Sequence, residues 1–280
     1  MGVVMLLITK SIFPCFRISF GSSLFFICLI FLLPLSALVM QLAQMSLSQY
    51  WKIITDPELV VAYQVTFLSA TIAALFNAVF GLLISWILIR YRFPGKFLLD
   101  ALIDLPFALP TAVAGLTLST LFSVTGWYGE FLDKLGIKIS YTWLGIVIAM
   151  IFTSVSFVIR TVEPVLDSLD QEYEEVAETL GANNWQIFSK IIFPEIAPAF
   201  LMGIILSFIR SLGEFGAVIF ISGNIAWKTE VVSLMIFIKL QEFDYPAASA
   251  IASVILASSL FLLFMANIMQ SYFSMRIRSN

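Results

Sequence analysis

Residues 172–194 read EYEEVAETLGANNWQIFSKIIFP, the longest charged and polar interval of a very apolar chain, with uncharged runs of spanning length on both sides. Its first half has apolar residues at the spacing of one helix face: Tyr173, Val176, Ala177 and Leu180. The glutamates of this half fall on the opposite face. Gly181 is expected to end the helix, because glycine readily adopts the left-handed conformation of helix C-termini.

A second apolar face follows the glycine, at Trp185, Phe188 and Ile192. Pro194 limits its continuation into the next segment, because proline lacks a backbone donor. The interval therefore predicts a helix, a tight turn and a second helix, displayed on one side of a membrane. A solvated amphipathic loop that packs on its own helix bundle accounts for the same spacing equally well.

The composition is typical of an all-α integral membrane protein. The chain has 280 residues, of which 60% are hydrophobic and 12% are charged, and its mean hydropathy is +1.00. Soluble domains carry about a quarter charged residues. There is no histidine, and the two cysteines, Cys15 and Cys28, indicate neither a disulfide framework nor a metal site.

Six apolar segments are long enough to cross a bilayer, and together they predict a single transmembrane domain over residues 1–280. They are residues 18–40, 62–89, 101–123, 143–159, 196–222 and 245–270. Lys10 and Arg17 precede the first segment without a small-residue cleavage site, which is typical of an uncleaved signal anchor. The fourth and fifth segments enclose a loop, residues 160–195, that contains the interval quoted above.

An even number of spans places both termini on one side of the membrane. That side carries nine basic residues: Lys10, Arg17, Arg90, Arg92, Lys96, Arg160, Lys190, Arg276 and Arg278. The other side carries five: Lys52, Lys134, Lys138, Lys228 and Lys239. The positive-inside rule therefore predicts a multi-pass protein with both termini and the 160–195 loop in the cytoplasm.

The third span contains Pro106 and Pro110. Each proline removes a backbone donor and frees the carbonyl four residues earlier. Because lipid offers no hydrogen-bond partner, this stretch is expected to be buried in protein or to line a wet cavity, and both prolines are pathway candidates. Asp100 and Asp104 fall in the first turn of the span, where capping is favoured over ion handling.

The fifth span contains Arg210 and Glu214, four residues apart on one helix face, with Gly213 and Gly216 on either side of the glutamate. An arginine near the bilayer centre costs about 2.5–3.5 kcal/mol on insertion scales, so its presence needs a reason. One reading is a buried ion pair that fixes helix packing. The other is a gate or a transient anion site, for which all four residues are candidates.

No catalytic or nucleotide-binding motif is present. Gly95-Lys96 lacks the earlier glycine and the following hydroxyl of a phosphate-binding loop, and the common hydrolase signatures are missing. The residues therefore predict that the chain is not an enzyme and has no cofactor of its own, and that any ATP must be bound by a partner.

The 172–194 interval resembles the EAA loop of permease subunits in binding-protein-dependent ABC importers. The family pattern is Glu-Ala-Ala, three residues, Gly, nine residues, Ile, one residue and Leu-Pro, and this chain keeps every spacing with Glu175-Val176-Ala177, Gly181, Ile191 and Phe193-Pro194. Val176 and Phe193 are mild apolar departures. In the family this loop docks in a cleft of a cytoplasmic ATPase. The resemblance implies a coupling site formed by Glu175, Ala177, Leu180, Gly181, Ile191 and Pro194.

Other segments, among them DLPFALPTAVAGLTL (104–118) and RSLGEFGAVIFISGNIAWKTEV (210–231), are similar to permeases of sulfate/thiosulfate importers, specifically their T-type subunits. The resemblance covers nearly the whole chain and implies a transport subunit with the six-helix fold of type I ABC importer permeases, located in a bacterial-type inner (plasma) membrane. It also implies three partners: a second homologous permease, a dimer of the ABC ATPase, and a periplasmic sulfate/thiosulfate-binding protein. Alternating access at the interface of the two permeases then moves the anion inward.

Two alternatives are compatible with parts of the sequence. A molybdate or tungstate permease shares the loop and also takes a tetrahedral oxyanion. An intramembrane enzyme could use Asp104 and Glu214 as paired carboxylates, although these residues are expected at different depths of the membrane. Transport that requires a separate ATPase would distinguish a permease from an enzyme.

Overall fold

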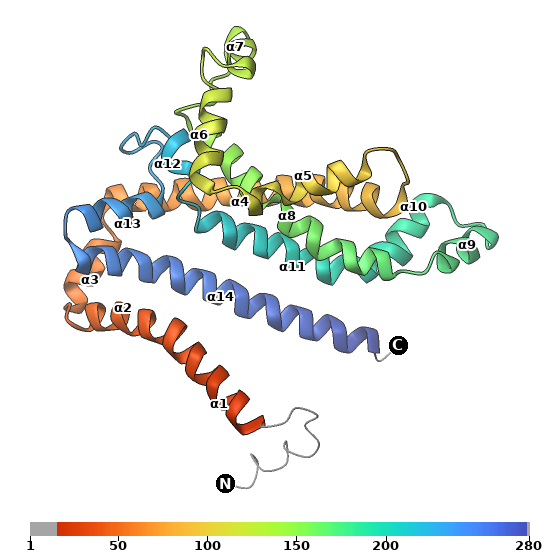
Figure 1. Cartoon of the computed structure of the whole chain (residues 1–280), viewed down its shortest axis with the longest axis horizontal. Coiled ribbons are helices and arrows are strands. Elements are labelled where there is room, and N and C mark those ends of the chain that lie inside the picture. Colours follow the sequence, from red (N-terminus) through yellow and green to blue (C-terminus); the bar gives the residue numbers. More distant parts are fainter. Residues whose placement is uncertain (1–15, 279–280) are drawn as a thin grey trace.

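The computed structural model describes residues 16–278, and every regular element of that range is helical (Figure 1). The N-terminal elements are α1 (Phe16–Ile27), the π-helical turn η1 (Cys28–Leu32), α2 (Leu33–Ala43), α3 (Leu47–Ile54) and α4 (Pro57–Arg90). The middle holds α5 (Lys96–Ala108), α6 (Thr111–Leu121), α7 (Trp127–Lys134) and α8 (Trp143–Ser168). The last part holds α9 (Glu172–Thr179), α10 (Asn184–Ile187), the π-helical turn η2 (Phe188–Ile192), α11 (Phe193–Leu212), α12 (Val218–Ile221), α13 (Val232–Gln241) and α14 (Tyr245–Arg278).

Five of these helical stretches are long and apolar enough to cross a membrane, and the bent pair α5–α6 makes a sixth if it is one span. Several helices are longer than the apolar segments within them. α8, for example, runs eight residues past Arg160 to Ser168. The span predicted from the sequence ended just before Arg160, because the residues beyond this arginine are more polar. Lys10 and Cys15 lie outside the described residues.

The centre of the bundle is formed by α4, α8 and α11, which approach closely because small residues line their contacts. The buried face of α4 repeats small residues from Ala62 through Ala70 and Ala73 to Gly81. A Cβ added at Gly81 would lie 2.8 Å from the Val158 side chain, and one added at Gly203 would lie 2.9 Å from the Val158 Cα. Glycine at both positions therefore lets α4 and α11 close on α8 from two sides.

A buried polar network joins the same three helices. The amide Nδ2 of Asn77 in α4 donates to Ser154 Oγ in α8 at 2.9 Å and to Ser207 Oγ in α11 at 3.2 Å. Ser211 Oγ donates to the same Ser154 oxygen at 3.0 Å. All four side chains are fully buried. Because lipid and apolar core offer these groups no alternative partner, the network fixes the register of the helices.

The third span is broken where its prolines predict a disturbance. Pro106 lies inside α5 and Pro110 is the N-cap residue of α6, and the direction of the chain bends by 112° from α5 to α6. Leu109 between them is extended, at ψ 134°, because the residue before a proline is disfavoured in the helical region. The expected continuous span 101–123 is thus two helices, and Figure 1 shows α6 leaving the direction of α5.

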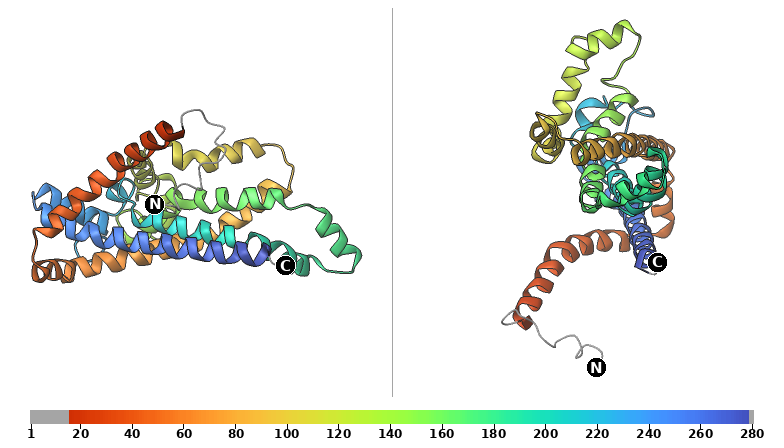
Figure 2. Two further views of the ribbon diagram at one scale, coloured as in Figure 1. Left: turned by 90° about the horizontal axis from the view of Figure 1, so that it is seen from below. Right: turned by 90° about the vertical axis from the view of Figure 1, so that its right-hand side faces the viewer.

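The long helices of the bundle run side by side in roughly the same direction, and short helices lie at both ends of the bundle. α3 and α13 lie at one end, and α9 and α10 lie at the other, toward which the last turns of α14 also run (Figure 1). Figure 2 shows α6–α7 and α1–α2 projecting from opposite sides of the bundle. No residue in the apolar window of the α1–α2 segment is buried within this chain, so its surface is available to lipid or to another subunit.

Candidate functional site

The turn after α9 is a Schellman motif built on Gly181. Its φ is +86°, and its N–H donates to the Glu178 carbonyl at 2.9 Å. The N–H of Ala182 donates to the Ala177 carbonyl at 3.0 Å, which completes the pair of bonds that defines the motif. The left-handed glycine expected from the sequence is therefore confirmed, and it closes the C-terminus of an eight-residue helix.

A capping box starts the helix that follows. The Asn183 side chain accepts from the Gln186 N–H at 2.9 Å, and the Gln186 side chain accepts from the Asn183 N–H at 2.9 Å. The helix then continues through η2 into α11 without a break. The N–H of Phe193 reaches back to the Phe188 carbonyl, a wider π-type turn that accommodates the donor lost at Pro194. The expectation that Pro194 limits continuation was wrong for this reason.

The apolar stripe of α9 does not lie against the bundle. Tyr173, Val176 and Leu180 are 66%, 52% and 83% exposed, and only Ala177 of that stripe is buried. Ala177 packs in one apolar cluster with Leu166 of α8 and with residues of α10 to α11. The amphipathic face predicted from spacing is thus divided: Ala177 seats the helix, and its larger apolar neighbours face outward together with the exposed Glu175.

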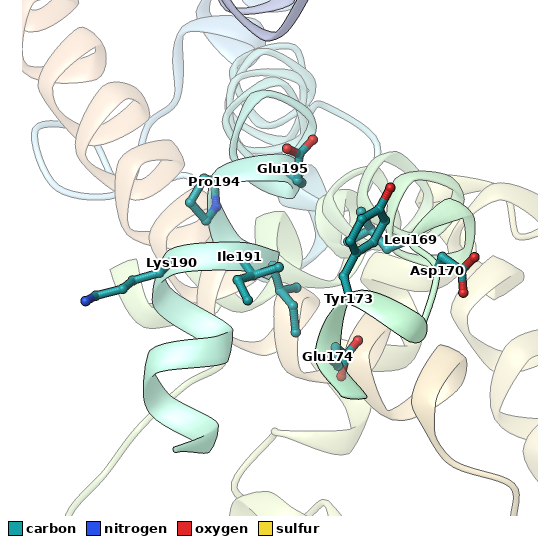
Figure 3. Close-up of a pocket in the computed structure, with 9 residues that line it drawn as sticks. Leu169, Asp170, Tyr173, Glu174, Lys190, Ile191, Pro194 and Glu195 are labelled. Carbon is teal, nitrogen blue, oxygen red and sulfur yellow. The ribbon is translucent and has the colours of Figure 1, made fainter. Parts of the chain in front are cut away.

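The α9–α10 module (residues 172–187) borders a cleft of about 440 Å³ that lies between α9 and the η2–α11 turn (Figure 3). Figure 3 shows Tyr173 and Glu174 of α9 on one wall, Ile191 and Pro194 on the other, and Lys190 pointing away from Tyr173. Trp185, 73% exposed, adds a further apolar side chain to the outward surface of α10. An exposed surface of this kind at one end of a membrane bundle is typical of a docking site for another protein.

The sequence profile of the family described as binding-protein-dependent transport system inner membrane component matches residues 77–279. The chain belongs to this family. The matched region begins at Asn77 and includes the α9–α10 module as well as the broken helices. As a member of the family, the chain is an inner-membrane transport subunit and not an enzyme.

Curated relatives extend the family assignment over nearly the whole chain. The chain is 68% identical to the sulfate transport system permease protein CysT of Escherichia coli (strain K12), over 96% of this chain and 97% of that protein. It is 44% identical to the CysT protein of Synechocystis sp., over 89% of this chain and 87% of that protein.

Solved structures of ABC importers share the fold. A bacterial ABC transporter that imports alginate matches with a TM-score of 0.73 at 18% identity, over 91% of this chain and 94% of that chain. The methionine transporter MetNI matches with a TM-score of 0.60 at 15% identity, over 82% of this chain and 99% of that chain. These likenesses show that the chain has the type I importer permease fold predicted from the family resemblance.

Within this family fold, the second group of candidate residues lies where two helices are interrupted. α11 ends at Leu212, Gly213 is its C-cap residue, and Glu214 lies beyond the helix end. Arg210 Nη1 is 2.6 Å from Glu214 Oε2, and the other carboxylate oxygen accepts from the Ala217 N–H at 2.9 Å. Glu214 is buried, whereas the Arg210 side chain is 31% exposed, so the pair joins the core to an accessible surface.

The break between α5 and α6 is seated on the residues just after Glu214. A Cβ at Gly216 would overlap the Thr111 side chain at the start of α6, and a Cβ at Gly115 would overlap the backbone of Ala217. The two interrupted helices are therefore packed against each other. This contact brings Pro110, Gly213, Glu214 and Gly216 into one region, while Pro106 lies one turn earlier, inside α5.

Asp100 and Asp104 do not cap a helix, because α5 begins at Lys96 with Gly95 as its N-cap residue. Both carboxylates pair with Arg160 of α8, with Nη1–Oδ1 and Nη2–Oδ2 distances of 2.8 Å. Glu163 is a third partner of this arginine, at 2.7 Å. The enzyme alternative needed Asp104 and Glu214 to act together, but each is paired with a different arginine.

A second acidic group lies at the opposite end of the bundle from α9. Glu230, in the segment before α13, is buried, and one of its carboxylate oxygens has no hydrogen-bond partner among the described residues. Burial raises the pKa of Glu230, and the negative charge of Glu58 at the start of α4 raises it further. Sequence reasoning missed this group, because the two glutamates come from different parts of the chain.

Sequence reasoning also missed how α9 is held. Arg90, the last residue of α4, forms an ion pair with Glu174. In the sequence analysis, Arg90 was only one of nine basic residues on the side of the termini. Glu174 was assigned to the polar face of the helix that precedes Gly181. No local pattern links an arginine at the end of one helix to a glutamate in a distant loop.

Proposed function

We propose that this chain is the membrane permease subunit of an ATP-driven importer of sulfate, with thiosulfate as a second substrate. The observation that carries the proposal is the 68% identity to a sulfate permease over nearly the full length of both proteins. At that level of similarity, substrate-contacting positions are expected to be largely shared. The relatives named above are all described as sulfate transport permeases.

The exposed face of α9 is the proposed docking site for a dimer of cytoplasmic ABC ATPases. Tyr173, Val176 and Leu180 offer apolar side chains at helical spacing, and Glu175 beside them offers a carboxylate to a donor on the partner. ATP is bound by that partner, since this chain has no phosphate-binding loop of its own. Gly181 sets the angle between α9 and α10, so that both helices meet a preformed cleft together.

The translocation pathway is proposed to lie where this permease meets a second, homologous permease. The packed breaks at Pro106, Pro110, Gly213 and Gly216 supply interrupted helices near this path, a feature that many transporters use at their substrate sites. Arg210 is partly exposed beside them and is the cation that an incoming anion would meet. A periplasmic binding protein delivers the anion on the side opposite α9.

The orientation of the chain follows from its charge distribution. Both termini, α9 and α10 lie in the cytoplasm in this proposal, because the basic residues of the loops are concentrated at that end.

Reconstituted transport tests the proposed function. The permease is purified with its co-purifying ATPase and second permease, inserted in proteoliposomes and supplied with binding protein and radiolabelled sulfate. We expect uptake that requires ATP, that excess thiosulfate blocks and that molybdate leaves largely unchanged. Preferential uptake of molybdate or tungstate would favour the alternative oxyanion permease, and uptake independent of the ATPase would contradict the proposal.

A further inference from the structure

The last turns of α4 contact α9 and the η2 turn that follows α10. Arg90 reaches α9, where its Nη2 forms an ion pair with Glu174 Oε1. The Arg90 side chain is only 9% exposed and that of Glu174 is 26% exposed. Among the described residues no other carboxylate pairs with Arg90. Glu174 therefore supplies the counter-charge for a nearly buried guanidinium.

Trp86 lies one helical turn before Arg90 and on the same face of α4. The guanidinium carbon of Arg90 is 5.7 Å from the centroid of the Trp86 ring, within the range of a cation–π interaction. The same ring meets Phe188 of η2 edge to face, with centroids 5.8 Å apart and an interplanar angle of 76°. One side of α4 thus holds α9 by charge and the α10–η2 segment by aromatic packing.

The rest of α9 is held loosely. The helix has eight residues, too few to be stable by itself, and Ala177 is its only buried residue. α10, which comes after α9, is part of the continuous α10–η2–α11 helix. The aromatic contact at Phe188 therefore holds that long helix and not α9. Without the Arg90–Glu174 pair, α9 would connect α8 to α10 with a single buried side chain to set its tilt.

α4 continues from this contact through the whole bundle. It has 34 residues, a length of about 51 Å, and it contributes Asn77 to the network that joins it to α8 and α11. A displacement of α9 that is transmitted to Arg90 therefore reaches the helix that crosses every layer of the core. A basic residue that merely marks the membrane surface would be exposed, as Arg92 is two positions later.

We propose that Trp86 and Arg90 form a clamp that fixes α9 and α10 to α4 and transmits their movement to the membrane helices. The clamp acts through Glu174 and Phe188, and both of its members are positioning residues for coupling rather than part of the docking face. The transport side of this inference rests on the proposed function, whereas the clamp itself is a property of this chain.

Substitution of each charge, with a charge exchange as the second variant, tests the clamp in the assembled transporter. In Arg90→Gln the turn at Gly181 and the side chains of Tyr173, Val176 and Leu180 are unchanged, so we expect the ATPase at saturating concentration to stay bound with unchanged basal hydrolysis. Glu174→Gln removes the same ion pair from the α9 side. The stimulation of hydrolysis by the loaded binding protein should fall about tenfold, the usual scale of a coupling free energy between sites. The exchanged pair Arg90→Glu with Glu174→Arg should recover a large part of this stimulation.

Arg92→Gln is the matched control, since it removes an exposed positive charge two residues after Arg90 that forms no ion pair with α9. Wild-type stimulation in Arg90→Gln, or an exchanged pair as defective as the single variants, would overturn the clamp. Hydrogen exchange of the amides of residues 172–180 provides a readout that needs no substrate: exchange should speed up in Arg90→Gln and not in Arg92→Gln. If the wild-type complex does not move sulfate, the proposed function fails, while the exchange rates still decide the clamp.

Discussion

Substitution of Gly181 tests whether the 172–194 loop couples the permease to the ATPase or is an ordinary loop. Gly181→Val is the most direct such substitution. The backbone there is left-handed, at φ +86°, and a Cβ added at this position has no neighbour within 4 Å. The added Cβ therefore overlaps no other atom of the protein. Its cost is the backbone strain alone, roughly 1–2 kcal/mol for a residue with a Cβ in this region.

This strain is small against the packing of the bundle, so Gly181→Val should insert and accumulate as the wild type does. The free loop can relax by opening the Schellman turn and tilting α9. A docked loop cannot relax in this way, because the outward-facing Tyr173, Val176 and Leu180 must meet a preformed cleft together. The cost then falls on docking, and a difference of 1–2 kcal/mol weakens ATPase binding about 5- to 30-fold.

The chain offers a control of the same backbone conformation. Gly95, between α4 and α5, has φ +89° and also has open space around its Cβ position. Gly95→Val carries the same strain outside the coupling module and should leave ATPase affinity unchanged. Gly181→Asn should stay near wild type, since asparagine tolerates the left-handed region.

The assay is co-purification of the ATPase over a range of concentrations, together with membrane levels of the permease and binding-protein-stimulated hydrolysis. We expect transport and stimulated hydrolysis to fall in proportion to ATPase retention. If Gly181→Val binds the ATPase and transports as the wild type does, the 172–194 loop is not the coupling element, and the proposed mode of coupling fails.

Three further predictions follow from the charged groups and the proposed orientation. Arg210→Ala leaves the buried Glu214 carboxylate without its ion-pair partner, which can cost about 3–5 kcal/mol. Assembly with the second permease should therefore fall, and the double variant with Glu214→Ala should recover it. A double variant as defective in assembly as Arg210→Ala would refute a structural ion pair. A double variant that assembles but does not transport assigns Arg210 to the anion pathway. In a cysteine-free background, Asn183→Cys should be labelled from the cytoplasm only, and labelling confined to the periplasm would reverse the orientation. Because the pKa of Glu230 is raised, the folded state binds this proton more tightly than the unfolded state does, and stability should fall as pH rises above the usual carboxyl range. Thermal unfolding in detergent should show this decline in the wild type and a weaker one in Glu230→Gln. Identical pH profiles of the two proteins would contradict this prediction.

The sequence by itself determined the features that depend on local chemistry. The number and length of the apolar segments follow from the order of residues in the sequence. Pro106 and Pro110 mark where the third segment is disturbed, but its division into two helices was not predicted. The left-handed turn at Gly181 follows from the residue type, because few other residues adopt that conformation at low cost. The spacing of the EAA-like residues was also sufficient to place the chain in its family.

Tertiary structure decided which side of each element is covered. The stripe on α9 had one helical spacing, yet Ala177 faces the bundle while Tyr173, Val176 and Leu180 face outward. An amphipathic pattern records that a face is apolar, but it does not record whether the bundle or another protein covers that face.

The ion pairs were likewise decided by packing between helices distant in sequence. Asp100 and Asp104 meet Arg160, and Arg90 meets Glu174. Each pairing exists because α4, α5, α8 and α9 converge at one end of the bundle (Figure 1). Charges on separate helices have no spacing that a sequence pattern can detect, so their partners are fixed only when the helices pack.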